Sequence, residues 1–178
     1  QHKNKFYVGW INRFSPRGTV EWYKTGESIG IYSVGVNLNG TKSGYKNELE
    51  SAGVALTGAE LSIAKNHSLQ IWNQYVENIF NSSLIQVDKI ANAQSPYYYG
   101  VQLIGQKAIS FGGNESIEKT YFNPHQSAFV FGGRLGKKEG NWDHSINFTR
   151  ITKQGRYMMP REWGRDPFYT FLLGERNE

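Results

Sequence analysis

The chain has 178 residues, of which 38% are hydrophobic and 15% aromatic, and its formal net charge is +5. This length suffices for one domain with a core of its own, and the absence of cysteine excludes disulfides and thiolate sites within the chain. The positive charge favours anionic partners, such as nucleic acid, lipopolysaccharide phosphates or carboxylate solutes.

No stretch reaches the roughly 18 consecutive apolar residues of a membrane-spanning helix. Many aromatic residues and 20 glycines at modest hydrophobicity instead favour strands that are apolar on one face only. The chain begins at Gln1 without a signal peptide, so we expect an exported form to be processed or truncated.

Alternating apolar and polar residues predict a series of strands. In the first, residues 5–14, the side chains of Phe6, Val8 and Trp10 share one face and Arg13 lies on the other. Further strands are expected at 53–64, 68–76, 83–91, 97–108, 127–136 and 142–152. Short connections are expected at 65–67, 77–82, 92–96 and 137–141.

Three long irregular segments, 15–52, 109–126 and 153–178, interrupt or follow these strands. If strand direction alternates along the chain, all three fall on one side, and three of the four short connections fall on the other. This asymmetry is typical of an all-β, antiparallel transmembrane β-barrel with short periplasmic turns and long external loops. The whole chain, 1–178, is then a single β-barrel segment.

The alternation itself fits two arrangements. In a membrane barrel the apolar face meets lipid and the polar face lines water, whereas in a soluble β-sandwich the apolar face is the core. The segments 53–64 and 97–108 mix their faces. Aromatic residues at strand ends suit membrane-interface girdles, and they equally suit the caps of a soluble core. The pattern therefore leaves open both a membrane barrel and a soluble β-sandwich that binds carbohydrate.

The last twenty residues combine three arginines, four acids and four aromatic side chains with two prolines. They show neither alternation nor a helical period, which predicts an ordered loop. Such a loop either serves a site or is an ion-paired part of the surface.

Several motifs are similar to those of a known family. The runs KFYVGW at 5–10, SPRGT at 15–19, GGRLG at 132–136 with Trp142-Asp143, and above all MPREWGRDPFYTF at 159–171 resemble OprD-type outer-membrane porins in their Bacteroidota version. The resemblance implies a barrel of about 18 strands. Because the chain carries only seven or eight strand segments, we expect it to be an internal fragment of that barrel.

The resemblance also implies a function. It is the passive, substrate-selective diffusion of small solutes, such as amino acids and small carboxylates, through a charged constriction in the outer membrane of a Gram-negative bacterium. An inward-folded loop would narrow the pore, and a ladder of basic side chains would guide carboxylates. Expected partners are outer-membrane lipid, lipopolysaccharide and small solutes. The assembly would be a homotrimer, a monomer, or a subunit of a larger envelope complex.

The candidate pore residues are charged side chains that the family's pattern or strand parity would direct inward. The basic candidates are Arg13 near the external mouth, Arg17 and Lys24 in the first long loop, Arg134 near the periplasmic end, and Arg161 and Arg165 in the final motif. The acidic candidates are Asp143, Glu162 and Asp166, with Asp88 as a further counter-charge. Each of them would alternatively be a solvated loop charge or part of a structural ion pair. The constricting loop is expected to be 15–52, with a purely external loop as the alternative.

Other functions find little support in the sequence. The four histidines are scattered, and there is no phosphate-binding loop, nucleophile motif or metal-ligand spacing, so neither an enzyme, a cofactor nor a metal is predicted. Glu162 and Asp166 lie beside arginines that would keep both ionised, which disfavours a glycosidase pair. Nucleic-acid binding is disfavoured because basic and acidic residues are interspersed. A TonB-dependent transporter is disfavoured because no plug-like segment is present.

Overall fold

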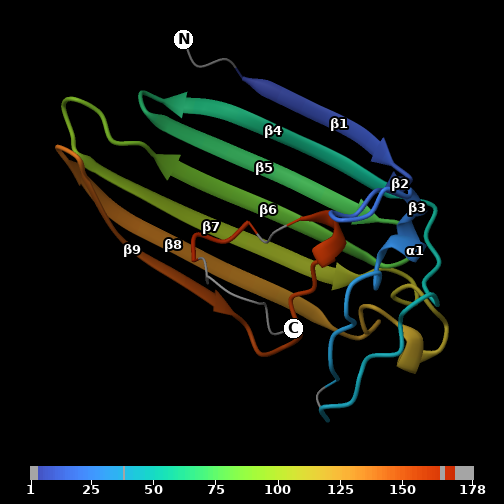
Figure 1. The fold of residues 1–178 in the computed structure, drawn as a ribbon. Coiled ribbons are helices and arrows are strands. Elements are labelled where there is room, and N and C mark those ends of the chain that lie inside the picture. Colours follow the sequence, from blue (N-terminus) through green and yellow to red (C-terminus); the bar gives the residue numbers. More distant parts are fainter. Residues whose placement is uncertain (1–3, 38, 165–166, 171–178) are drawn as a thin grey trace.

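The computed structural model describes residues 4–37, 39–164 and 167–170, and these form an all-β fold with little helix. Seven strands make one antiparallel sheet in the order β1-β4-β5-β6-β7-β8-β9 (Figure 1). Their bounds are β1 (Lys5–Ile11), β4 (Val54–Ala64), β5 (His67–Val76), β6 (Phe80–Lys89), β7 (Tyr97–Ala108), β8 (Ser127–Glu139) and β9 (Trp142–Ile151). The edge strands β1 and β9 do not pair with each other, so the sheet is open.

The remaining elements are short. They are the two-stranded sheet of β2 (Arg13–Phe14) and β3 (Tyr23–Lys24), the helical turn α1 (Thr25–Ser28), and the 3-10 turns η1 (Ile117–Lys119) and η2 (Arg161–Trp163). Within the described part of the chain, none of these helical turns has the length and apolar character needed to cross a membrane.

The strand predicted at 97–108 matches β7 residue for residue, and most other predicted strands agree with the structure to within three residues at each end. The first predicted strand, 5–14, was wrong in its second half. The main sheet ends at Ile11, where the carbonyl of Asn12 accepts a hydrogen bond from the backbone of Thr25 at 3.2 Å. The chain thereby leaves the main sheet.

Two connections are shorter than the sequence predicted. The turn expected at 137–141 contracts to two residues because Gly140 adopts a φ of 57°, which a tight hairpin requires. The link expected at 77–82 contracts to three residues around Asn78, which has a φ of 62°. Asparagine tolerates this left-handed conformation better than most residues do.

The predicted sorting of the connections is confirmed for the described residues. Because consecutive strands of the main sheet are antiparallel neighbours, the segments 12–53 and 109–126 lie at one end of the sheet, and the final segment starts there after β9 (Figure 1). The connections after β4, β6 and β8 lie at the other end.

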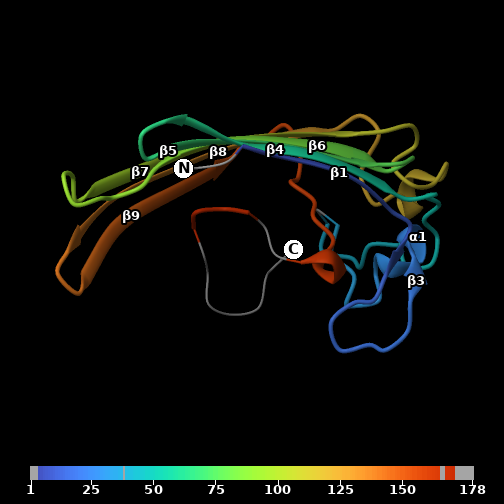
Figure 2. The same cartoon turned by 90° about the horizontal axis from the view of Figure 1, so that it is seen from above.

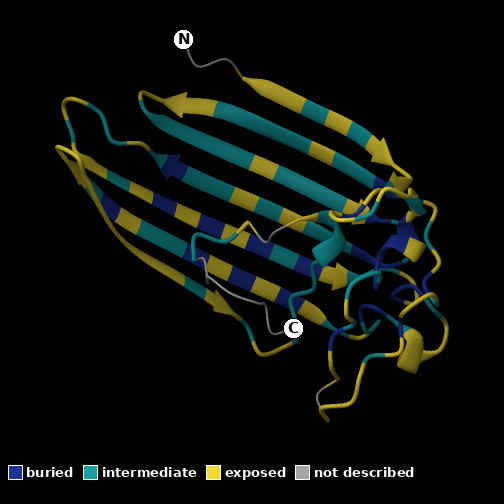
Figure 3. Ribbon diagram, viewed as in Figure 1, coloured by how far each residue is buried: buried dark blue, intermediate teal, exposed yellow. Residues whose placement is uncertain are grey.

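The two faces of the sheet have opposite character, which is clearest in β7. Its exposed residues are Tyr97, Tyr99, Val101, Leu103 and, at the loop end, Lys107, whereas Gly100, Gln102, Ile104 and Gln106 are buried on the other face (Figure 3). We call these the outer face and the inner face. A soluble protein buries most of its apolar side chains and exposes its amides, so the distribution of side chains on β7 is largely the opposite of that in a soluble protein.

The outer face carries bare apolar side chains on strands across the sheet. Those exposed on it are Phe6, Val8, Trp10, Ile71, Tyr75, Ile85, Tyr97, Tyr99, Val101, Leu103, Phe129, Phe131, Leu135, Trp142, Ile146 and Phe148. Among the described residues, no second sheet buries them, which is what a β-sandwich would require.

The hydrophobic core lies at the loop end of the sheet, on the inner side. It joins strand ends to the long loops and consists of Ile29, Tyr45, Leu49, Val54, Val76, Ile79, Phe80, Tyr121 and Phe122. Seen from above, the sheet is curved and the long segments gather beneath its concave side (Figure 2). The long loops therefore form the hydrophobic core together with the strand ends, on the face opposite the exposed apolar side chains.

Candidate functional site on the inner face

The final segment crosses the inner face of the sheet. We call residues 157–164 and 167–170 the strap. The side-chain amide of Gln106 donates to the backbone carbonyl of Met158 at 2.6 Å and accepts from the backbone amide of Met158 at 2.8 Å. Gln102 donates to the carbonyl of Pro167 at 2.8 Å. The strap is thus held to β7 by side chains that bind its backbone.

A charged cluster anchors the far end of the strap. Asp88 is only 5% exposed, and its Oδ1 accepts from Arg134 Nη2 at 2.9 Å and from the Tyr169 hydroxyl at 2.8 Å. Its Oδ2 accepts from Gln86 at 2.6 Å. The Arg134 guanidinium lies 4.8 Å from the centre of the Tyr169 ring. Glycine at residue 100 leaves room for this cluster, because a Cβ there would collide with the side chains of Tyr169 and Asp88.

The cluster has a definite ionisation pattern. Burial, and next the hydrogen bond to the Asp88 carboxylate, raise the pKa of the Tyr169 hydroxyl well above its ordinary value of 10.0. Tyr169 therefore stays a neutral donor, while Arg134 and Asp88 balance each other. Strap and sheet meet at a site with no net charge.

Arg134 lies on the inner face, as strand parity predicted, but it forms an ion pair with Asp88. Its Nε is buried and has no hydrogen-bond partner among the described residues. Asp143 lies near the short-turn end of the same face. It accepts from the Tyr98 hydroxyl at 2.6 Å and is 3.7 Å from Lys138.

The basic candidates of the first loop do not lie on the main sheet. Arg13 and Lys24 pair with each other in the small sheet of β2 and β3, so the expectation that Arg13 continues the first strand was wrong. Arg17 is exposed, and its backbone carbonyl accepts a hydrogen bond from the Tyr32 hydroxyl. Lys24 Nζ lies 4.0 Å from the carboxylate of Glu27.

Of the candidates in the final motif, Glu162 binds the first loop. Arg161 and Glu162 belong to η2, and Glu162 Oε1 accepts from the backbone amides of Gly30 at 2.8 Å and Tyr32 at 3.2 Å. The neighbouring Trp163 donates to Ser28 at 2.9 Å and stacks on Phe14 at 4.5 Å. Arg165 and Asp166 lie outside the described residues. The predicted charged residues therefore do not form one ladder on the described part of the sheet.

Sequence reasoning missed the role of the inner-face amides. Gln86, Gln102 and Gln106 are spaced at even intervals on strands whose opposite face is apolar, which placed them on the polar face. The strap partners of Gln106 and Gln102 lie 52 and 65 residues away in the sequence, and Gln86 pairs with Asp88 and Gln102. No local pattern reports such distant contacts.

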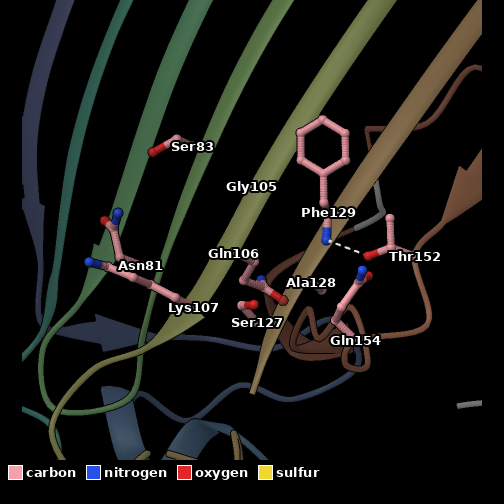
Figure 4. Close-up of a pocket in the computed structure, with 10 residues that line it drawn as sticks. All are labelled: Asn81, Ser83, Gly105, Gln106, Lys107, Ser127, Ala128, Phe129, Thr152 and Gln154. Atoms are coloured by element: carbon pink, nitrogen blue, oxygen red, sulfur yellow. Dashed lines mark hydrogen bonds between the residues drawn. The ribbon is translucent and has the colours of Figure 1, made fainter. Parts of the chain in front are cut away.

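The loop end of the outer face holds a second feature, an open pocket of about 670 Å³ (Figure 4). Asn81 and Lys107 are register partners on β6 and β7, and Ser83 and Ser127 lie beside them on the same face. Gly105 has no atom within 4 Å of a Cβ position. Lys107 has no acidic partner among the described residues. This pocket offers a cation, amide and hydroxyl groups beside the apolar band.

Comparisons of the chain with protein-family models, with curated proteins and with solved structures found no match.

Proposed function

We propose that this sheet forms part of the wall of an outer-membrane β-barrel of about 18 strands, through which small polar solutes diffuse passively and selectively. The observation that carries the proposal is the inverted distribution of side chains. The outer face presents apolar residues without a cover, and the inner face buries glutamines and an ion pair beneath the strap.

Two physical arguments support the lipid assignment of the outer face. An apolar surface that extends over seven strands is far larger than soluble monomers expose, so it needs an apolar environment. A closed barrel would also pair the free edges of β1 and β9, which an open sheet in lipid leaves unsatisfied. Closure would be supplied by further strands.

The strap suits the role of a selectivity element. It lies on the polar side of the sheet and is anchored at several points, so it would narrow the space that the barrel encloses. The segment 15–52 contributes residues to the hydrophobic core at the loop end of the sheet, and its role as the constricting loop stays a prediction. The Asp88–Arg134 pair lies beneath the strap with its charges compensated, so this part of the inner face would present no net charge, which suits small polar solutes without a net charge.

The outer pocket supports a lipid partner. Lys107 with its hydroxyl and amide neighbours lies at the end of the sheet that bears the long loops, which is the external end in the proposed barrel. Phosphate groups of lipopolysaccharide would find a cation there, at the depth where the apolar band ends. Arg150, on the outer face of β9, is a second cation at that interface.

Cysteine labelling tests which face meets lipid, and the chain's lack of cysteine gives a clean background. In the full-length protein reconstituted in vesicles, we expect Ile71→Cys, on the outer face, to resist a water-soluble maleimide until detergent is added. The adjacent Gln70→Cys, on the inner face, should react in both conditions. Equal labelling of the two positions in vesicles would contradict the proposal. Planar-bilayer recordings then test conduction, and a protein that inserts without conducting would not be a pore.

A further inference from the structure

A groove of about 250 Å³ lies between the inner face and the strap. Its floor is formed by β4 to β7, and its roof by Tyr157, Met159 and Pro167 of the strap. None of the residues that line it carries a charge at neutral pH. The volume lies just below the roughly 300 Å³ at which pockets for drug-sized ligands begin, so it suits a ligand of about one ring.

Two glutamines in this groove have unused hydrogen-bonding capacity. Gln70 and Gln74 lie on the inner face of β5, on either side of Trp72, and neither side chain has a hydrogen-bond partner among the described residues. Gln86, in contrast, is committed to Asp88 and Gln102. Each free amide can donate and accept at once.

Between these amides lies the indole of Trp72, which also lines the groove. The rings of Trp72 and Tyr7 stack with their centres 4.9 Å apart and their planes at 29°. The strand between them carries Gly58, where a Cβ would collide with the indole. Glycine at this position therefore lets the indole lie low across the sheet.

These features discriminate between classes of solute. A charged solute would lose hydration without gaining a counter-charge from the lining. A wholly apolar solute would cover the two amides and leave them unpaired. A sugar ring satisfies both requirements, because its C–H face packs on an indole and its hydroxyl groups pair with amides. We infer that the groove is a binding subsite for neutral saccharides. The inference rests on the proposed pore, since it names the class of solute that the inner face favours.

Block of the ion current by sugar tests the inference in the full-length protein. Maltotriose should occlude the channel at lower concentration than a polyethylene glycol of the same hydrodynamic radius. The double variant Gln70→Leu/Gln74→Leu should raise the apparent Kd for maltotriose about tenfold, as expected for the loss of two neutral hydrogen bonds. The control Asn73→Leu, on the outer face of the same strand, should leave that Kd unchanged. An unchanged Kd in the double variant would overturn the inference.

A second measurement separates this inference from the proposed pore. Maltotriose should shift the tryptophan fluorescence of the detergent-solubilised protein, and Trp72→Phe should abolish that shift. A channel that conducts ions but shows neither selective block nor a fluorescence shift would refute the saccharide subsite and leave the pore intact. A fluorescence shift in a protein that does not conduct would refute the pore and support the subsite.

Discussion

Replacement of Asp88 by asparagine tests whether the buried ion pair anchors the strap. The substitution keeps the shape of the side chain but leaves Arg134 without an acidic partner. Removal of one partner from a buried ion pair costs about 3–5 kcal/mol. Because the Arg134 side chain is 33% exposed and that of Asp88 only 7%, we expect the lower end, about 3 kcal/mol of unfolding free energy.

The chain offers a matched control on the same face. Asp143 is also paired with a lysine and a tyrosine hydroxyl, but its side chain is 52% exposed. Exposed pairs contribute at most about 1 kcal/mol, so Asp143→Asn should lower the unfolding free energy by at most about a third as much as Asp88→Asn. Urea titration of the detergent-solubilised protein, followed by circular dichroism, measures both. Similar small losses for the two variants would show that the Asp88 cluster does not anchor the strap.

Two further predictions concern the same cluster. Gly100→Ala should lower the unfolding free energy by about 1–3 kcal/mol in the same titration, because the new Cβ would meet Tyr169 and Asp88. The control Gly105→Ala lies on the same strand where the space is open, and it should lower the unfolding free energy by less than half as much. Because the pKa of Tyr169 is raised in the folded state, its contribution to the unfolding free energy should be complete below pH 10. That contribution should decrease as the pH rises above 10, because the hydroxyl then loses its proton in the unfolded state while the folded state still holds it. Tyr169→Phe should remove this alkaline component of the pH-stability profile, and an identical profile in the variant would refute the assignment.

The strands were largely predictable because alternation is a local signal. β7 was predicted to the residue, although its faces mix apolar and polar residues, because the turn residues 92–96 and the irregular segment from 109 mark its two ends. The end of β1 was not predictable, because it depends on a hydrogen bond between Asn12 and Thr25, on either side of a long loop. The start of β6 depended on Asn78 adopting a left-handed conformation, which the residue type allows but does not require.

The charged residues of the site were identified by type but not by partner. Arg134 and Asp88 were both recognised as inner-face charges, and parity was enough for that. Their pairing depends on the strand order and the register, because one strand, β7, lies between β6 and β8. Glu162 was a candidate pore residue by its type, but its hydrogen bonds to two backbone amides of the first loop, 130 or more residues away, were not predicted. Parity assigns a face, whereas contacts of this range need the folded chain.

The mode by which Gln106 holds Met158 has a consequence for variation. Gln106 uses its amide to bind the main-chain N–H and C=O of Met158, as a neighbouring strand would, and it makes no demand on the methionine side chain. Mutation can therefore replace the side chain of Met158 while the backbone keeps its hydrogen bonds to Gln106. Evolution could in this way change the side chain presented above the inner face without changing the backbone contacts that hold the strap.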